Sequence, residues 1–171
     1  VDAGECVAQR ERELRERDSV DVVAFAQPTP RDKELLLEFA GMRNLTVAWG
    51  DLTVYADVAA AMADIDIVLH VGAVVSPLAD AHPLLARRVN VGSMQNIIRA
   101  VKAARDPARI AVVGVGSVAE TGDRQEPVHW GRIGDPLRVS QFDEYGQTKV
   151  IAEKLLVDSG LPRWAWLRQT G

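Results

Sequence analysis

Residues 65–71 read IDIVLHV and residues 109–115 read RIAVVGV, and the sequence between them at 82–104 is rich in helix-forming residues. Both apolar runs are short and continuous, which is typical of strands buried on both faces of a parallel sheet. Parallel neighbours in one sheet need a long crossover connection, and a helix at 82–104 provides one. The stretch from 65 to 115 therefore predicts a strand–helix–strand unit.

The same alternation of strand and helix extends in both directions along the chain. It predicts strands at 21–26, 45–49 and 164–169, helices at 5–17, 32–40, 54–64 and 143–159, and an irregular stretch at 119–142. Repeated units of this kind predict an α/β fold, a doubly wound, Rossmann-like parallel sheet with helices on both faces, built as one domain over 1–171. Such sheets bind ligands beyond the carboxyl ends of their strands, here after Trp49, Val71 and Val115.

Composition and charge narrow the class of protein. The chain has 171 residues and a formal net charge of −4 without a basic stripe, which argues against nucleic acid as a partner. No apolar run reaches the ~20 residues of a membrane-spanning helix, and the N-terminus has no secretory pattern. Cys6 is the only cysteine, which excludes an internal disulfide and a zinc site of paired thiolates. We therefore expect a soluble cytoplasmic protein that acts on a small molecule and holds no metal.

The segment Tyr145-Gly146-Gln147-Thr148-Lys149 carries the most chemistry. A helix would place Tyr145 and Lys149 one turn apart on the same face, so that their polar ends converge. A nearby ammonium group lowers the pKa of a tyrosine by favouring the phenolate, which suits proton exchange near neutral pH. The pair alone is a weak signal, because the same spacing also occurs by chance on helix surfaces.

Ser117 supplies the context that this pair needs. It follows the strand at 109–115, where a doubly wound sheet presents its ligand-binding groups, and its hydroxyl can bind a carbonyl or alcohol oxygen. A loop serine that caps its own backbone is the alternative, and for a single site it is the commoner case. Ser117, Tyr145 and Lys149 together favour catalysis.

Five segments in this order resemble the extended short-chain dehydrogenase/reductase family, the NAD(P)-dependent epimerases, dehydratases and related ketone reductases. They are GDL (50–52), DIVLHVGA (66–73), VNVGSMQN (89–96), VVGVGSVAETG (112–122) and YGQTK (145–149). The resemblance runs from about residue 20 to residue 171. It implies that Ser117 orients the substrate oxygen, that Tyr145 exchanges a proton with it, and that Lys149 lowers the tyrosine pKa and holds the nicotinamide ribose. Hydride then passes between the substrate carbon and the nicotinamide.

The resemblance also implies residues along the cofactor. Asp51 and Leu52 are similar to family positions that border the adenine ring, although Asp51 or Thr53 could equally cap a helix. A second stretch, Val71-Gly72-Ala73, is similar to the family segment along which the cofactor passes close to the backbone. A plain tight turn would also use Gly72.

Three more side chains were predicted near the site. Asn90 shares a helical face with the apolar Met94, so its amide should point inward; it either braces the active-site lysine in the cofactor site or is a satisfied core amide. His129 and Trp130 lie in the irregular stretch that borders the substrate in relatives, although a loop histidine is usually only solvated.

The sequence also departs from the family pattern. Members begin with a strand and a Gly-x-x-Gly-x-x-Gly loop that cradles the pyrophosphate, whereas here Gly4 is the only glycine before Gly41. The first strand and its loop are therefore expected to be missing, as is the C-terminal substrate lobe. Ser93 stands where the family usually has glycine. Gln27 stands where an acid would select NAD, and with Arg31 and Lys33 nearby NADP is slightly favoured.

Three functional hypotheses follow from these patterns. The leading one is the core of an NAD(P)-dependent oxidoreductase or epimerase/dehydratase that uses Ser117, Tyr145 and Lys149. The others are a noncatalytic dinucleotide-sensing or scaffold protein, and an inactive fragment unable to bind the cofactor. The resemblance further implies a homodimer formed through the helices at 82–104 and 143–159.

Overall fold

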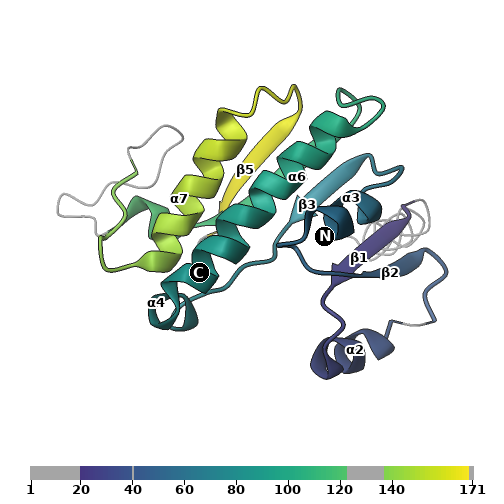
Figure 1. The fold of residues 1–171 in the computed structure, drawn as a ribbon, viewed down its shortest axis with the longest axis horizontal. Helices are drawn as coiled ribbons and strands as arrows, with labels where there is room; N and C mark the ends of the chain where they lie inside the picture. Colours follow the sequence, from purple (N-terminus) through teal and green to yellow (C-terminus); the bar gives the residue numbers. More distant parts are fainter. Residues whose placement is uncertain (1–19, 40, 123–136, 170–171) are drawn as a thin grey trace, which may run out of the picture. The chain divides into compact units, whose positions relative to one another are not determined.

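The computed structural model describes residues 20–39, 41–122 and 137–169 (Figure 1). The chain divides into two compact units, the first ending at Asp51 and the second beginning at Leu52. Each unit consists of parallel strands that alternate with helices. This arrangement confirms the predicted Rossmann-like α/β class, while the helix predicted at 5–17 lies outside the described residues.

The first unit is one strand–helix–strand repeat, formed by β1 (Val22–Ala26), α2 (Pro30–Leu37) and β2 (Leu45–Trp49). β1 and β2 pair in parallel, and β1 has no other paired neighbour among the described residues. Thr29 caps α2, because its hydroxyl accepts a hydrogen bond from the backbone N–H of Asp32 at 3.1 Å. Pro30 then occupies the first turn, which explains why the helix begins two residues before the predicted start.

The second unit contains a three-stranded parallel sheet in the order β3 (Ile67–His70), β4 (Ala111–Ser117) and β5 (Trp164–Gln169). Across this sheet His70 lies opposite Gly114, and Gly114 lies opposite Trp166. β5 has the predicted limits, whereas β4 starts later than predicted and continues to Ser117. The serine is therefore the last residue of the central strand.

The helices of the second unit are α3 (Tyr55–Ala61), α4 (Leu78–Ala81), α5 (Pro83–Ala86), α6 (Gly92–Ala103) and α7 (Glu144–Val157). A π-helical turn at Arg87–Val91 joins α5 to α6, so the single helix predicted at 82–104 has an irregular turn inside it. Among the described residues no helix combines the length and apolarity needed to cross a membrane.

One face of the three-stranded sheet is covered by α6 and α7, which run side by side in Figure 1. Side chains on that face alternate along β4 with those of the other face, and Val112, Gly114 and Gly116 are buried. On the opposite face, Leu69 remains 61% exposed and Leu167 53% exposed. The hydrophobic core of the described second unit is thus concentrated between β4 and these two helices.

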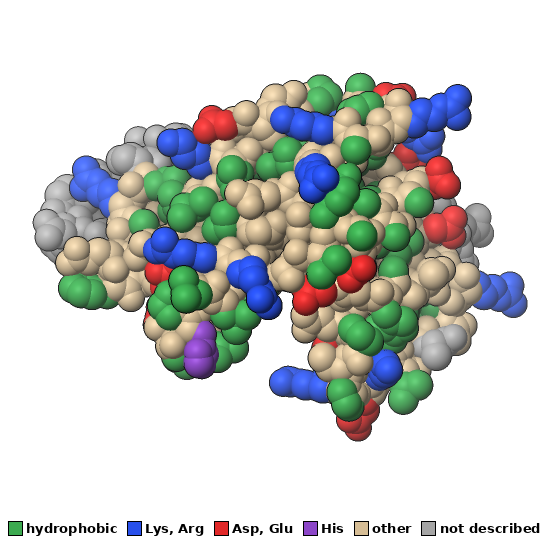
Figure 2. Space-filling model, viewed as in Figure 1, with side chains coloured by type: hydrophobic (Ala, Val, Ile, Leu, Met, Phe, Trp, Pro, Cys, Tyr) green, Lys and Arg blue, Asp and Glu red, His purple; other side chains and the backbone are tan. Residues whose placement is uncertain are grey.

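The face of the molecule drawn in Figure 2 carries both basic and acidic side chains. Figure 2 shows basic and acidic side chains interspersed with apolar ones over the described part of that face. We see no continuous basic stripe on this face of the described chain.

Candidate functional site

Ser117 lies where β4 passes into a short 3₁₀ turn at Val118–Thr121. Its hydroxyl accepts a hydrogen bond from the backbone N–H of Ala119 at 3.2 Å, and its own backbone N–H donates to Glu120 Oε1 at 2.8 Å. Ser117 therefore caps its own turn, which is the alternative that the sequence left open beside catalysis. An accepting hydroxyl still has its O–H to donate, so this cap does not prevent contact with a ligand.

α7 presents the predicted tyrosine and lysine. Asp143 caps the helix by accepting from the N–H of Gly146 at 2.8 Å, which sets Tyr145 in the first turn and Lys149 one turn later. Lys149 Nζ donates to the carbonyl of Val115 at 2.7 Å and lies 5.8 Å from the centre of the Tyr145 ring. The helix thus brings both side chains to the carboxyl end of β4.

Ionisation at this position differs from the sequence-based expectation. The pKa of Tyr145 is raised, first because burial disfavours the phenolate, and also because of the Glu120 and Asp143 charges; a hydrogen bond with the Ser117 side chain acts in the lowering direction. The lowering predicted for Lys149 is not among the causes of this shift, which in the chain alone is an increase. The pKa of Lys149 is itself lowered, because the ammonium group is buried.

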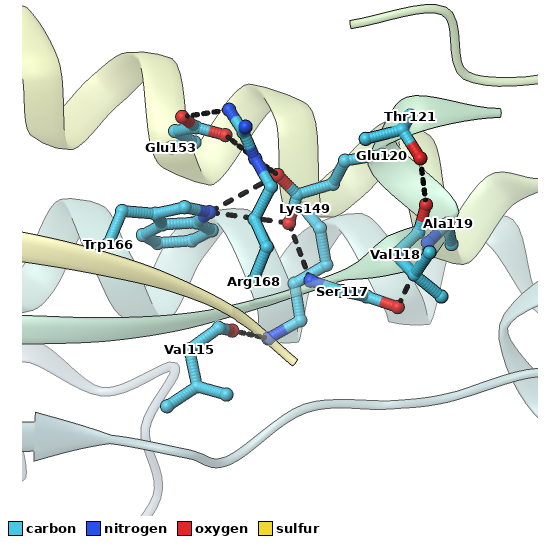
Figure 3. Close-up of polar contacts among 10 residues, drawn as sticks. All are labelled: Val115, Ser117, Val118, Ala119, Glu120, Thr121, Lys149, Glu153, Trp166 and Arg168. Atoms are coloured by element: carbon cyan, nitrogen blue, oxygen red, sulfur yellow. Dashed lines mark hydrogen bonds and ion pairs between the residues drawn. The ribbon is translucent and has the colours of Figure 1, made fainter. Parts of the chain in front are cut away.

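A buried carboxylate that sequence reasoning missed lies beside Ser117. The Glu120 side chain has no exposed surface, and it accepts from the backbone of Ser117, from Trp166 Nε1 and from Arg168 Nε (Figure 3). Arg168 also binds Glu153 of α7 at 2.6 Å, so one guanidinium joins two carboxylates. Burial and the neighbouring Glu153 raise the pKa of Glu120 to about 7.

Two glycines of β4 make room for this cluster. A Cβ atom on Gly114 would overlap the ring of Trp166, and one on Gly116 would overlap both Glu120 and Trp166. Glycine weakens a strand unless a large neighbour needs the space, so the alternating glycines of VVGVGS were an available signal. The partner of those glycines could not be read from the sequence, because Trp166 lies far along the chain.

A second buried polar group lies at the end of β3 and was also missed. The His70 ring nitrogen Nε2 lies 3.0 Å from the hydroxyl of Ser93, and that hydroxyl donates to the carbonyl of Asn90 at 3.3 Å. Burial, followed by the charge of Lys149, lowers the pKa of His70 to about 4. His70 is therefore neutral near pH 7, and the departure to serine at 93 gives the ring a hydrogen-bond partner.

Asn90 is buried as predicted and all of its polar atoms have partners. Its Oδ1 accepts from the N–H of Val74 at 2.7 Å, and its Nδ2 donates to the carbonyl of Val74 and to Thr148 Oγ1. The amide therefore ties the loop after β3 to α7, next to Lys149 rather than to Lys149 itself. Asn90 therefore has the bonds of the satisfied core amide, and its bracing of Lys149 stays a prediction.

The remaining predicted cofactor residues lie in loops. Leu52 is held by Asn96 of α6, whose amide donates to its carbonyl at 2.9 Å, and the Leu52 side chain lies against Gly72. Val54 is the N-cap of α3, so neither Asp51 nor Thr53 has that role. Val71 is exposed and Ala73 is partly buried in the loop after β3. His129 and Trp130 lie outside the described residues.

A cavity of about 540 Å³ lies elsewhere in the second unit, along the π-helical turn at Arg87–Val91 and the start of α6, with Ile151 of α7 in its wall. Its wall includes Arg87, Arg88 and Gln95 but none of the predicted site residues. Arg87 already pairs with Glu144. The cavity therefore does not coincide with the chemistry at the end of β4.

The residues at the end of β4 fit part of a dinucleotide. An ammonium group with three donors, of which Val115 uses one, and a phenol one helical turn away can hydrogen-bond ribose hydroxyls. Within residues 20–39, 41–122 and 137–169 no loop has the Gly-x-x-Gly-x-x-Gly pattern of the family's pyrophosphate cradle.

Comparisons with known proteins show the family and the fold of the chain. A protein-family model described as NAD(P)H-binding matches residues 4–171. The enzyme WbmH of Bordetella bronchiseptica, solved with NAD+, superposes with a TM-score of 0.69 at 23% identity, covering 92% of this chain and 50% of that one. UDP-glucose 4-epimerase of Thermus thermophilus, solved with NAD, gives a TM-score of 0.71 at 20% identity, covering 92% and 49%.

A third solved structure, Pen from Bacillus thuringiensis, has 27% identity and a TM-score of 0.64, covering 81% of this chain and 37% of that one. The chain thus spans half or less of the length of these three structures. No curated protein matches it in sequence. The family model and the shared fold confirm the expected nucleotide-binding architecture.

Proposed function

The chain belongs to the NAD(P)H-binding family, and from this premise we propose that it is the core of an NAD(P)-dependent oxidoreductase or epimerase/dehydratase of the extended short-chain type. The observation that carries the proposal is the meeting of Ser117, Tyr145 and Lys149 at the carboxyl end of β4. A hydroxyl, a phenol and an ammonium group around one strand end are suited to binding a carbonyl oxygen and exchanging a proton with it. The substrate is accordingly an alcohol or a carbonyl compound.

The chain's own residues would handle the oxygen and the proton. A bound nicotinamide would supply or accept the hydride. Ser117 donates a hydrogen bond to the substrate oxygen, and Tyr145 gives its proton to that oxygen during reduction. The phenol of Tyr145 is protonated near neutral pH, which is the form that such a donor needs, and its raised pKa leaves that state unchanged. Lys149 binds the ribose and stabilises the phenolate once the proton has left.

The preference for NADP rests on the first unit. Gln27 follows β1 directly and is exposed, so no acid at this position repels a 2′-phosphate. Arg31 and Lys33 in the first turn of α2 are exposed cations near the same strand end. Asp51 and Leu52 remain the proposed adenine contacts.

Binding of the reduced cofactor tests the proposal. We expect the chain to bind NADPH more tightly than NADH, followed by cofactor fluorescence, and we expect Lys149→Met to weaken binding roughly 10-fold or more, because a charged hydrogen bond contributes about 1.5–3 kcal/mol. Lys154→Met is the matched control on the exposed side of the same helix, and it should leave binding unchanged.

The outcomes separate the three hypotheses. Binding that is absent, or that Lys149→Met leaves unchanged, would reject the site and favour a chain unable to hold the cofactor. Binding without any oxidation of NADPH by a panel of ketones and nucleotide sugars would favour a noncatalytic nucleotide-binding protein. Oxidation that Tyr145→Phe abolishes, with NADPH binding retained, is the result we expect.

A further inference from the structure

We infer that Glu120 is a positioning residue of this site, one that holds the backbone of Ser117 and acts through its charge on Tyr145 and Lys149. The inference deepens the proposed function and rests on it for the roles of those three residues. Glu120 would not touch the substrate, because its side chain has no exposed surface. It would act through the groups around it.

The hydrogen bonds of Glu120 fix Ser117 at the end of β4. Ser117 and Glu120 bind each other reciprocally, with the serine N–H donating to Oε1 at 2.8 Å and the serine hydroxyl capping the same 3₁₀ turn. Trp166 and Arg168 of β5 donate to the carboxylate at 3.2 Å. The position of Ser117 is therefore set by the neighbouring strand as well as by its own turn.

The strand is built to accept this carboxylate. Gly116 leaves the space that Glu120 and Trp166 occupy, and Gly114 leaves the space for the Trp166 ring. Glycine at alternate positions weakens a strand by itself, so a packed partner over both glycines is needed to offset the loss. The glycines of β4 and the donors of β5 thus together form a specific binding site for the Glu120 carboxylate.

The charges that face Glu120 come from two other elements. Arg168 reaches it from β5, while Glu153, Lys149 and Tyr145 face it from α7 (Figure 3 shows all but the tyrosine). The negative charge of Glu120 raises the pKa of both Tyr145 and Lys149. It thereby favours the protonated phenol and the ammonium form, the two states that the proposed reduction uses.

Titration of the tyrosines tests this inference without cofactor or substrate. The chain has two tyrosines, Tyr55 and Tyr145, so ¹³Cζ-labelled tyrosine gives two signals. In Glu120→Gln we expect the pKa of Tyr145 to fall, and the Tyr55 signal serves as the internal reference. Glu153→Gln is the matched control, since Glu153 is paired with Arg168 and is not among the charges that act on Tyr145. An unchanged Tyr145 titration in folded Glu120→Gln would overturn the inference.

Amide hydrogen exchange tests whether Glu120 holds the backbone of Ser117. The amide N–H of Ser117 should exchange at least about 10-fold faster in Glu120→Gln than in the wild-type chain, because the charged acceptor of its bond is lost. If the variant does not fold, the wild-type chain decides alone: the Tyr145 signal should show a step as Glu120 titrates near its pKa of about 7, and a signal without that step would reject the link. Failure to bind NADPH would reject the proposed function while leaving these readouts intact.

Discussion

Two buried polar clusters share one face of the three-stranded sheet and lie on either side of Gly114. The histidine cluster consists of His70, Ser93, Asn90 and Thr148, and the glutamate cluster consists of Glu120, Trp166, Arg168 and Glu153. Gly114 separates them, because His70 and Trp166 are its neighbours on β3 and β5. The first cluster is held by neutral hydrogen bonds, whereas the second contains three ionisable side chains.

The two clusters respond to pH in opposite directions. The pKa of His70 is lowered from 6.5 to about 4, so its stabilising contribution is complete above pH 6.5 and is lost as the pH falls toward 4. The pKa of Glu120 is raised from 4.5 to about 7, so its contribution is complete below pH 4.5 and is lost as the pH rises through 7. The clusters therefore oppose one another across the same range.

Filling the space at Gly114, between the two clusters, should lower the free energy of unfolding more than any other change proposed below. Gly114→Ala would place a methyl group within the Trp166 ring and should lower the free energy of unfolding by about 3–5 kcal/mol, because a rigid indole cannot move away cheaply. Urea denaturation measures it. Gly92→Ala is the control: nothing lies within 4 Å of its added carbon, and we expect a gain of up to about 1 kcal/mol in the helix. Equal effects at the two glycines would contradict the packing described for Trp166.

How far the sequence predicts these clusters depends on the distance between partners. Apolar runs bounded by turns predict the strands well: β2 and β5 have the predicted limits. Local spacing also predicts that Tyr145 and Lys149 share a helix face. The π-helical turn at Arg87–Val91 was not predicted, because helix-forming composition indicates a helix without showing where its hydrogen-bond pattern changes.

Partners far apart in the chain explain the remaining misses. Glu120 looks like an ordinary loop acid until Trp166 and Arg168, more than 40 residues later, close over it. The raised pKa of Tyr145 could not be predicted for the same reason, because burial depends on the packed structure and not on the spacing to Lys149. The sequence thus indicates where the chemistry lies, and the folded surroundings decide how its groups ionise.

A smaller change, the loss of stability at acidic pH, tests the histidine cluster alone. The wild-type chain should lose about 3 kcal/mol of stability from His70 alone as the pH falls from 6.5 to about 4, since each pKa unit corresponds to about 1.4 kcal/mol. His70→Gln should remove this acid-side slope from denaturation curves measured across the range. His82→Gln, at an exposed histidine, should retain the slope. A variant at position 70 with the wild-type slope would show that the buried ring is not the source.

The smallest change in stability is expected when one hydrogen bond is removed from the glutamate cluster. Trp166→Phe keeps most of the ring packed over Gly114 but removes the Nε1 donor to Glu120, and should lower stability by about 1 kcal/mol. The loss should be greater well above the Glu120 pKa of about 7 than well below it, because a charged acceptor binds a donor more strongly than a neutral one. Trp164→Phe, at an indole 41% exposed, should show no such pH dependence. A loss at Trp166 that is the same at both pH values would mean that the indole stabilises the strand by packing alone, and that the charge on Glu120 is balanced by Arg168 without it.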